Sequence, residues 1–421
     1  MPGRRSSPLG RILNRRAERA VKAALADTRV VLVNGARQAG KSTLVQLVGA
    51  DRGIPWRSLD RAEIRNAARS DPTEFVAGDE PMIIDEVQRV PELFLSIKEV
   101  VDTDHRPGRF LLTGSARVLG LRGLPDALPG RMETIELWPL SQGEIEGTPD
   151  GFVDAVFGDG PDLRHESQES RAGYAARVTR GGFPEAVARP DPRRRAQFFD
   201  SYVADLINRD VLQLSEIENG TAMRALTRML AARSGQLLVP AALGNALELS
   251  RNTVNRYISL LEEVFLIKRV PAWSRNLSAR AVGTPKVACV DSGIAANLLD
   301  LTTDRLVRPD GGLGPLLEGF VLMELCRQLS WSDRRTELYH YRTKDGVEVD
   351  AVLEDRRGGV VGVEVKAAAT VRDDDFRGLR HLASRLGSDF IVGLVLYTGS
   401  LTLPFGPRMR AMPISALWET G

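Results

Sequence analysis

Cysteine, histidine and long apolar runs are all scarce in this chain. The two cysteines, Cys289 and Cys326, are too few for a disulfide framework and lack the spacing of a metal site. No apolar stretch approaches the roughly 20 residues that a bilayer-spanning helix needs. The arginine-rich N-terminal segment has neither an apolar core nor a cleavage site, which argues against export and predicts a cytoplasmic protein without a membrane contact. The histidines are too scattered for a zinc site, and they are His105, His165, His340 and His381.

Lysine is also rare, and the net charge is small. Of the 57 basic residues only seven are lysine, so arginine supplies almost all of the positive charge. The 55 acidic residues leave a net charge of +2, which argues against wholesale polyanion binding but allows a local basic face. A chain of 421 residues with 43% hydrophobic residues is globular in composition and too long for one compact core. We therefore expect about two to four domains.

A glycine-rich motif directly follows the apolar run of residues 30–33. Its pattern, G-x-x-x-x-G-K-[ST], is typical of a loop whose backbone amides cradle phosphates. We expect Lys41 to reach the β and γ phosphates and the Ser42 hydroxyl to bind Mg²⁺. Residues 43–48 then read as a helix whose N-terminal dipole faces the anion. The residues expected to hold the nucleotide are Gly35, Ala36, Arg37, Gln38, Ala39, Gly40, Lys41, Ser42 and Thr43.

Two adjacent carboxylates end a second apolar run, which begins at residue 81. A buried parallel strand delivers such side chains at its C-terminal edge, where ligands bind in sheets of this kind. We expect Asp85 to complete the Mg²⁺ shell and Glu86 to orient and polarise the attacking water. An exposed acidic turn is the alternative, but the preceding phosphate loop favours the catalytic interpretation.

A third strand is expected at residues 109–112, with hydroxyl side chains directly after it. Either Thr113 or Ser115 could lie near the γ-phosphate and sense hydrolysis, although both residue types also suit an ordinary strand-to-loop turn. Arg131, in a Pro-Gly-Arg stretch, is a candidate for neutralising transition-state charge in its own or a neighbouring subunit. With Glu86 and Lys41, these side chains form the predicted catalytic set.

These motifs resemble those of the AAA-superfamily ATPases of bacteria and archaea. The resemblance rests on the phosphate loop, the Ile-Ile-Asp-Glu strand, residues 112–115, the Pro-Gly-Arg stretch and residues 138–141. Residues 181–185, 202–206 and 209–210 resemble more closely those members whose C-terminal half is the domain of unknown function 4143. The resemblance implies a cytoplasmic nucleotide-hydrolysing protein in which a helical segment packs as a lid over the nucleotide. It also implies that ring-shaped homo-oligomers are common among the relatives.

The apolar pattern predicts an α/β fold in four parts. Residues 1–147 would form the doubly wound parallel sheet of a P-loop NTPase core. Residues 148–230 are helical in pattern and would form the lid. Residues 231–305 would form a winged helix-turn-helix, and residues 306–421 a restriction-endonuclease-like α/β domain.

Two short helices around a turn are predicted between residues 237 and 270. Ser250 caps the second helix, whose apolar residues recur at helical spacing and would face the core. Its polar side chains would face outward and could reach base edges or phosphates in a major groove. The same module could instead pack against another domain or a protein partner. The candidate DNA contacts are Arg251, Asn252, Asn255 and Arg256.

A second candidate catalytic centre lies in the last part of the chain. Valines alternate with Glu364 and Lys366, so these two charged side chains emerge on one face of a strand. Asp350 ends an earlier alternating strand that could pair with it as a hairpin. In restriction-endonuclease-like nucleases, a D…E-x-K set of this kind holds a divalent ion on the acids while the lysine steadies the attacking hydroxide. A salt-bridged pair without catalysis would have the same sequence pattern. Glu318 resembles the helical acid of this set, with Glu324 as the fallback.

Three functions fit this chain, each with ATP and Mg²⁺ as cofactors. The favoured one is an ATPase whose nucleotide state moves the lid, and thereby the winged-helix and nuclease-like modules, on DNA. The second is a nuclease gated by ATP. The third is a regulatory switch that binds a protein partner and uses nucleotide turnover as a timer.

Overall fold

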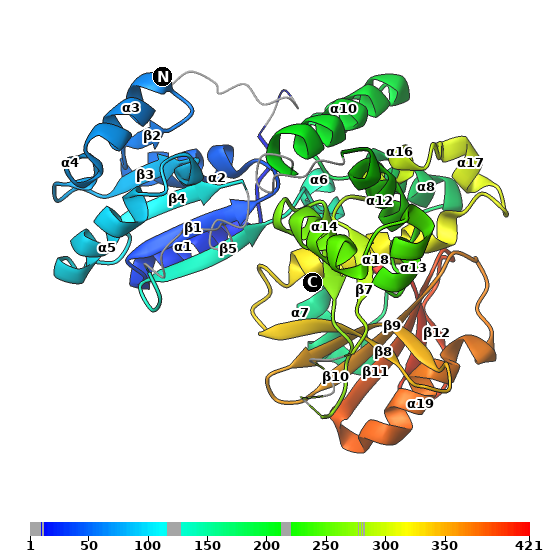
Figure 1. Cartoon of the computed structure of the whole chain (residues 1–421). Coiled ribbons are helices and arrows are strands. Elements are labelled where there is room, and N and C mark those ends of the chain that lie inside the picture. The colour runs from blue at the N-terminus through cyan, green and yellow to red at the C-terminus, as the bar shows by residue number, and fades with distance from the viewer. Residues whose placement is uncertain are drawn as a thin grey trace. The chain divides into compact units, whose positions relative to one another are not determined.

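The chain folds into two compact units. The computed structural model describes residues 10, 12–115, 128–211, 220–276, 278, 280 and 283–421, without the side chains of residues 209 and 210. The first unit contains residues 12–140 and 263–265, and the second contains residues 141–262 and 266–421 (Figure 1). The predicted end of the first domain, residue 147, therefore lies close to the observed break. The predicted division of the remainder into three domains stays a prediction, although its segments pack as one unit.

A five-stranded parallel sheet forms the centre of the first unit. The strand order is β2-β3-β4-β1-β5, so β1 lies between β4 and β5 and the chain turns back across the sheet at this point. The predicted apolar runs all fall on strands, because side chains on both faces of a parallel sheet are covered. The strands are β1 (Val30–Gly35), β2 (Trp56–Ser58), β3 (Met82–Asp85), β4 (Phe110–Gly114) and β5 (Met132–Leu137).

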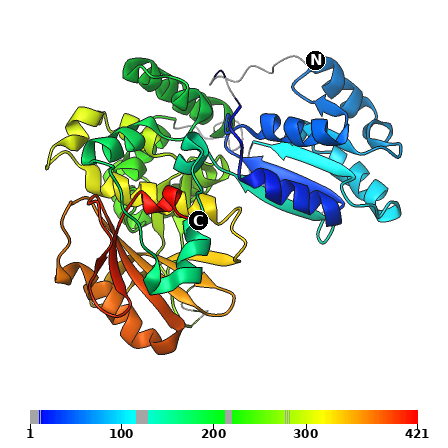
Figure 2. The same cartoon turned by 180° about the vertical axis from the view of Figure 1, so that it is seen from behind.

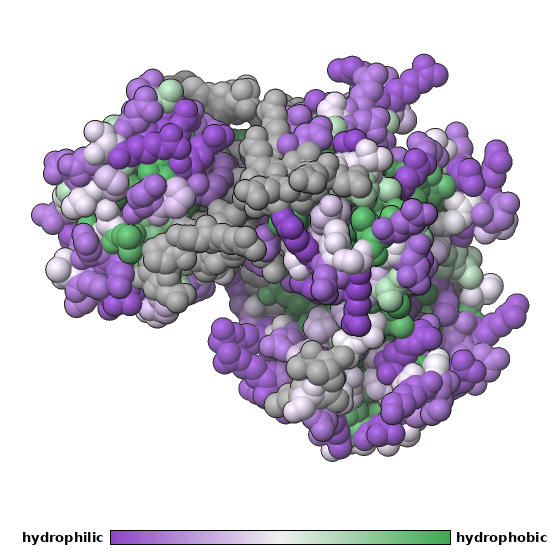
Figure 3. Space-filling view, in the orientation of Figure 1, coloured by the Kyte–Doolittle hydropathy of each residue, from purple (hydrophilic) through white to green (hydrophobic). Residues whose placement is uncertain are grey.

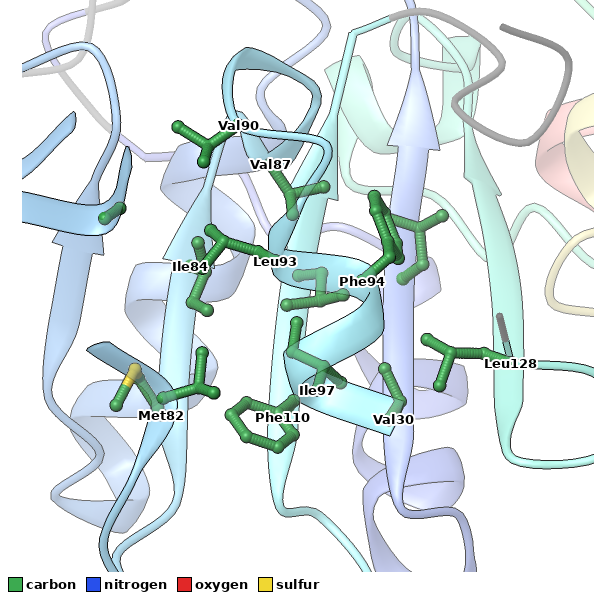
Figure 4. Packing of buried hydrophobic residues seen from close by; sticks show 14 of the residues in the cluster. Val30, Met82, Ile84, Val87, Val90, Leu93, Phe94, Ile97, Phe110 and Leu128 are labelled. Atoms are coloured by element: carbon green, nitrogen blue, oxygen red, sulfur yellow. The ribbon is translucent and has the colours of Figure 1, made fainter. Parts of the chain in front are cut away.

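Helices cover both faces of this sheet. The helices α1 and α2 lie on one face (Figure 2), where their apolar residues pack with Val31 and Val33 of β1. On the other face, Val30 and Leu32 share a core with Leu93, Phe94 and Ile97 of α5 (Figure 4). This alternation along β1 gives the unit its three layers. The helices are α1 (Ala17–Asp27), α2 (Lys41–Arg52), α3 (Ala62–Ser70), α4 (Pro72–Val76), η1 (Val87–Arg89) and α5 (Leu93–Thr103).

The second unit begins with a helical segment, as the sequence predicts. Residues 212–219 of the predicted lid lie outside the described residues. Exposed arginines on α10 contribute to the hydrophilic surface of this unit (Figure 3). No described helix is both long and apolar enough to cross a membrane. The helices are α6 (Gln142–Glu146), α7 (Phe152–Asp159), η3 (Gly160–Asp162), α8 (Arg171–Arg180), α9 (Pro184–Val187), α10 (Pro192–Asp205), η4 (Leu206–Val211) and α12 (Gly220–Ala232).

Two helices and an antiparallel strand pair follow α12. A three-residue turn joins α13 (Pro240–Leu247) to α14 (Arg251–Glu263), and the Ser250 hydroxyl accepts from the Thr253 N–H at 3.1 Å as the predicted cap. The strands β6 (Ile267–Val270) and β7 (Lys286–Cys289) pair antiparallel. Two short helices, α16 (Ser292–Leu298) and α17 (Thr303–Val307), complete this stretch.

A mixed six-stranded sheet, ordered β12-β13-β11-β10-β9-β8, forms the C-terminal part. β9 and β10 make the predicted antiparallel hairpin, but Asp350 is the third residue of β9 rather than its last. The strand continues because residues 351–353 are buried and pair with β10. The elements are α18 (Leu313–Gln328), β8 (Thr336–Arg342), β9 (Glu348–Asp355), β10 (Val360–Lys366), η5 (Asp373–Phe376), α19 (Arg377–Leu386), η6 (Gly387–Asp389), β11 (Phe390–Tyr397), β12 (Leu403–Pro404), β13 (Met409–Pro413) and α20 (Ala416–Glu419).

Candidate nucleotide site and a second acidic centre

The glycine-rich loop joins β1 to α2. Gly40 has φ +98°, a left-handed conformation that favours glycine, and it directly precedes Lys41, the first residue of α2. At Gly35 the constraint comes from β5, because a Cβ there would lie 2.1 Å from the Leu137 carbonyl oxygen. The Lys41 Nζ donates to the carbonyl oxygens of Gly35 and Ala36 at 3.0 and 2.9 Å. The ammonium group therefore lies against the loop that the motif assigns to phosphates.

The remaining loop residues alternate between anchoring and accessible positions. Ala36 and Ala39 are fully buried, whereas Arg37 is half-buried. Gln38, which also has a left-handed φ of +59°, and Thr43 are exposed. Buried alanines thus hold the loop on the sheet while its outer side stays accessible to a ligand.

Hydroxyl groups surround the Asp85 carboxylate at the end of β3. Ser42 Oγ and Thr113 Oγ1 donate to Asp85 Oδ1 at 2.8 and 2.6 Å, and Ser58 Oγ donates to Oδ2 at 3.2 Å. Asp85 is only 4% exposed, so these donors compensate for its burial. The structure brings the two expected metal ligands, Ser42 and Asp85, into contact. Ser58 belongs to no recognised motif, and sequence reasoning missed it.

Glu86 follows Asp85 in a left-handed conformation with φ +60°, which is uncommon for a non-glycine residue. Its Oε2 accepts a hydrogen bond from Ser115 Oγ at 3.0 Å and another from Gln88 Nε2. Gln88 Nε2 also donates to Ser115 Oγ at 2.8 Å. The Glu86 N–H donates to Thr113 Oγ1 at 2.9 Å. Thr113 therefore binds the backbone of Glu86, whereas Ser115 and the unpredicted Gln88 bind its carboxylate.

This set of donors suits a magnesium-bound nucleotide. A serine hydroxyl and a carboxylate are hard oxygen ligands of the kind that Mg²⁺ prefers, and they meet at 2.8 Å. Within the described part of the chain, no group of three or more acidic, histidine or cysteine side chains could hold a metal by itself. Mg²⁺ commonly completes its shell with phosphate oxygens and water, and the α2 N-terminus beside Ser42 favours such an anion.

Arg131 lies at the opposite end of the sheet from this site. β1 and β5 are parallel, with Val30 beside Met132 and Gly35 beside Leu137. Arg131 precedes β5 and is therefore about 20 Å from the loop, by the rise of a strand. Its guanidinium pairs with Asp102 on α5. The prediction that Arg131 neutralises charge in its own subunit is wrong, and a role toward a neighbouring subunit stays a prediction.

Arg15 is a buried cation beside the loop that no motif marks. Its Nη1 donates to the Ala39 carbonyl oxygen at 2.6 Å, and its Nη2 donates to the Trp138 carbonyl oxygen at 2.7 Å. A Cβ on Gly40 would lie 3.3 Å from the same Nη1. Arg15 therefore connects the loop to the segment after β5, and only the folded chain reveals this role.

The predicted D…E-x-K residues form a second, acidic centre in the C-terminal sheet. Glu364 and Lys366 emerge on one face of β10 as predicted, and Lys366 Nζ donates to Glu364 Oε1 at 2.9 Å. Lys286 of β7, which sequence reasoning missed, contacts both Glu318 and Asp350 and lies 2.8 Å from Asp350 Oδ1. The fallback acid Glu324 lies elsewhere, fully buried against Arg327 and the Gln142 N–H, so Glu318 is the helical acid of this centre.

Burial and mutual charge shift the pKa values of these groups. Burial, with the nearby Asp350 carboxylate, raises the pKa of Glu318 and that of Glu364 above their ordinary values. Burial alone would lower the pKa of Lys286, but the carboxylates of Asp350 and Glu318 outweigh it and raise this pKa. Lys286 is therefore a charged ammonium at neutral pH.

The predicted outer face of α14 is accessible. Val254, Tyr257 and Leu261 are buried, as their helical spacing predicts. The four candidate DNA contacts on the other side of the helix are all exposed, and they are Arg251, Asn252, Asn255 and Arg256.

Family models match three stretches of this chain. Residues 27–146 match the model of the AAA domain, and residues 313–417 match the domain of unknown function DUF4143. The chain has an AAA-type P-loop ATPase domain and a DUF4143 domain. Residues 171–305 match a third model, the domain of unknown function DUF8612. This match crosses the predicted boundary at residue 230, as does the second compact unit.

Uncharacterized proteins of three bacteria are similar to this chain. An uncharacterized protein of Mycobacterium tuberculosis is 29% identical over 426 residues, which cover 99% of this chain and 88% of that protein. An uncharacterized protein of Mycobacterium bovis matches to the same extent. An uncharacterized protein of Haemophilus influenzae is 24% identical over 257 residues, which cover 58% of this chain and 57% of that protein.

Several solved structures have a chain trace similar to part of this chain. The Walker-type ATPase PABY2304 of Pyrococcus abyssi has a TM-score of 0.40 at 14% identity, covering 68% of this chain and 96% of that chain. The RuvB Holliday junction branch migration motor of Thermotoga maritima has a TM-score of 0.30 at 19% identity, covering 64% and 93%. At such scores the fold assignment rests on the parallel sheet and the AAA match.

Proposed function

We propose that the AAA domain binds ATP with Mg²⁺ and hydrolyses it. The observation that carries this proposal is the 2.8 Å hydrogen bond between Ser42 Oγ and Asp85 Oδ1. In this proposal Lys41 and the amides of the loop bind the phosphates, and Ser42 and Asp85 hold Mg²⁺. The ion would supply positive charge beside the phosphoryl group that is transferred.

Glu86 is the proposed water-orienting residue. Its carboxylate would accept a hydrogen bond from the attacking water and polarise it toward the γ-phosphate. Ser115 and Gln88 both donate to Glu86 Oε2, so they would fix the direction of the free carboxylate edge. Thr113, hydrogen-bonded to Asp85 Oδ1 and to the Glu86 N–H, would fix the positions of the two acids relative to each other.

Turnover and binding measurements on two variants test this assignment. Glu86→Gln is expected to bind ATP like the wild type but to lose about 100-fold or more in turnover, because only the water-orienting carboxylate is neutralised. Lys41→Ala is expected to lose nucleotide binding. Glu92→Gln, the same change at an exposed acid of the first unit, is the matched control and should retain turnover. Wild-type turnover in Glu86→Gln would reassign the catalytic base.

We further propose that the second unit acts on DNA, with α13, α14, β6 and β7 as a winged helix-turn-helix. The support is the division of α14 into a buried apolar face and an exposed face with two arginines and two asparagines. Such side chains suit base edges and phosphates in a major groove. The antiparallel hairpin of β9 and β10, with Asp350 and Glu364 side by side, supports a restriction-endonuclease-like fold for the DUF4143 domain.

Duplex DNA in the ATPase assay tests this part separately. We expect DNA to stimulate turnover and to be retained in a salt-dependent manner. Arg251→Ala with Arg256→Ala should reduce retention at least tenfold, whereas Arg193→Ala with Arg194→Ala on α10 removes equal charge from another exposed face and should not. If ATP turnover is equal with and without DNA and the DNA is not retained, the regulatory switch that binds a protein partner is the function that remains. This proposal assumes a cytoplasmic protein. In a homo-oligomer, Arg131 of a neighbouring subunit could complete the nucleotide site.

A further inference from the structure

A buried lysine lies among the acids of the DUF4143 domain. Lys286 is only 3% exposed and comes from β7, outside the stretch of residues that matches the DUF4143 model. Its Nζ contacts Glu318 of α18 and Asp350 of β9 at the same time. Lysine is one of the rarest residue types of this chain, yet a lysine rather than an arginine stands here. Its compact ammonium lies between the carboxylates of Glu318 and Asp350.

The oxygens that a divalent ion would need are largely occupied by donors of the chain. Asp350 Oδ1 accepts from Lys286, and Asp350 Oδ2 accepts from the Val365 N–H at 3.0 Å. Glu318 Oε1 accepts from Lys286, and Glu364 Oε1 accepts from Lys366. Glu364 Oε2 is buried without a hydrogen-bond partner among the described residues. Around Lys286 the acids are therefore not arranged as a cation site, and no group of three or more acidic, histidine or cysteine side chains among the described residues could hold a metal ion.

We propose that the Lys286 ammonium occupies the cation position of this centre, so that the wild-type protein holds no divalent metal there. The inference rests on the proposed nuclease-like arrangement of the acids and is independent of the proposed ATPase activity. Its immediate consequence is that this centre does not hydrolyse phosphodiesters by a metal-dependent route, because the ion that would activate water has no place in it.

The lysine cannot simply move aside for a metal. Its side chain is buried, and loss of both carboxylate partners would leave an unpaired ammonium inside the protein. Removal of Lys286 would also leave Glu318, Asp350 and Glu364 close together with only Lys366 to balance them. The ammonium therefore has the charge-balancing role that a metal has in an acidic cluster.

The same ion pairs connect two parts of the chain that different family models match. β7 belongs to residues 171–305, whereas α18 and β9 belong to residues 313–417. Cβ of a residue at Gly235 would lie 2.9 Å from the Glu318 side chain, so the segment before α13 also packs closely on this acid. The centre thus connects these two stretches within the second unit.

Manganese binding to the full chain tests the proposal. All variants carry Asp85→Asn and are measured without nucleotide, so that Mn²⁺ detected by electron paramagnetic resonance does not come from the AAA domain. The parent is expected to bind no Mn²⁺ at this centre. Lys286→Met, which keeps the length of the apolar stem but removes the charge, is expected to gain one site at least tenfold tighter than any in the parent. Lys286→Arg, which keeps the charge, is the matched control and should gain none.

Two further comparisons assign the site and protect against a folding defect. Addition of Asp350→Asn to Lys286→Met should abolish the gained site. A parent that already binds Mn²⁺, with the binding lost in Asp350→Asn, overturns the proposal without any Lys286 variant. A folded Lys286→Met that gains no Mn²⁺ overturns it as well. If ATP turnover is absent while Lys286→Met gains the Mn²⁺ site, the ATPase proposal fails and this inference stands.

Discussion

At the scale of single residues, the two hydroxyls after β4 have different surroundings. Thr113 is fully buried, donates to Asp85 Oδ1 and accepts from the Glu86 N–H, so both of its hydrogen-bonding functions serve the protein. Ser115 instead donates to the Glu86 carboxylate and accepts from Gln88. A sensor of hydrolysis must respond to the reacting groups, and Ser115 is the hydroxyl that contacts the proposed water-orienting acid.

The contrast between these hydroxyls gives a first prediction. Thr113→Val removes a donor to the buried Asp85 carboxylate and the acceptor of the Glu86 N–H, and is expected to destabilise the protein by about 1–3 kcal/mol. Ser115→Ala is expected to change stability little but to lower ATP turnover about tenfold or more, because Glu86 loses a donor that orients it. Urea denaturation and turnover of both variants separate the two effects. Equal loss of stability in both variants would contradict this division of roles.

His340 of β8 gives a prediction about pH. It is 1% exposed, and burial lowers its pKa to about 4. Nε2 donates to the Thr284 carbonyl oxygen at 2.9 Å as the neutral ring requires. The folded protein binds this proton less readily than the unfolded chain does, so the neutral His340 stabilises the fold above pH 6.5. This contribution, about 3 kcal/mol, is lost as the pH falls toward 4.

Urea midpoints of the wild type and His340→Gln at pH 7 and pH 4.5 check this prediction. Glutamine keeps an N–H donor but does not titrate in this range, so the variant should lose less stability on acidification than the wild type. Carboxylates elsewhere contribute equally to both proteins. Identical losses would mean that His340 keeps its ordinary pKa in the fold.

At the scale of elements, the Gly-Gly turn between α8 and α9 packs on the cap of α16. Asp291 Oδ1 accepts from the Gly293 and Ile294 N–H groups at 2.9 and 3.1 Å, and Oδ2 accepts from the Gly182 N–H at 2.7 Å. Gly181 has φ +67°, and a Cβ there would lie 2.2 Å from Asp291 Oδ1. Gly181 is thus needed for the close approach of this turn to a buried carboxylate.

Gly181→Ala is therefore expected to destabilise the second unit by about 2–4 kcal/mol, from a strained backbone and a displaced cap. Gly158→Ala is the matched control, since Gly158 lies in α7 with open space around it and an ordinary φ. Alanine in the last turn of this helix is expected to be neutral or stabilising by up to about 1 kcal/mol. Thermal unfolding of both variants provides the comparison, and equal melting temperatures would show that the turn adapts.

Sequence patterns predicted those elements whose residues act locally. The phosphate loop, the strand that delivers Asp85 and Glu86, and the alternation of Glu364 with Lys366 each follow from a short stretch of chain. Ser58, Arg15 and Lys286 escaped prediction, because each reaches its site from a distant segment and belongs to no motif. Arg131 is the opposite case. It lies in a stretch that resembles a motif, but the folded sheet places it at the end of β5 away from the phosphate loop.

At the scale of the whole molecule, the sequence pattern predicted the first domain boundary better than the later boundaries. The parallel sheet of the first unit buries its own residues on both faces, so its boundary follows from local apolar runs. The later segments share contacts such as those of Asp291 with Gly182 and of Lys286 with Asp350. Such contacts join stretches that look separate in the sequence, which is why one compact unit holds three predicted domains.

Because each unit has its own core, calorimetry is expected to show two unfolding transitions. ATP with Mg²⁺ should raise the unfolding temperature of the first unit only, since a ligand stabilises the state that binds it. At a ligand concentration of 100 times the dissociation constant, this stabilisation is about 2.7 kcal/mol. Glu86→Gln is the protein to use, because the nucleotide then survives the scan, and Lys41→Ala in the same background should abolish the increase. A single transition that ATP raises as a whole would mean that the units unfold together. An increase confined to the other transition would place the nucleotide in the second unit and remove the phosphate loop from the proposed function.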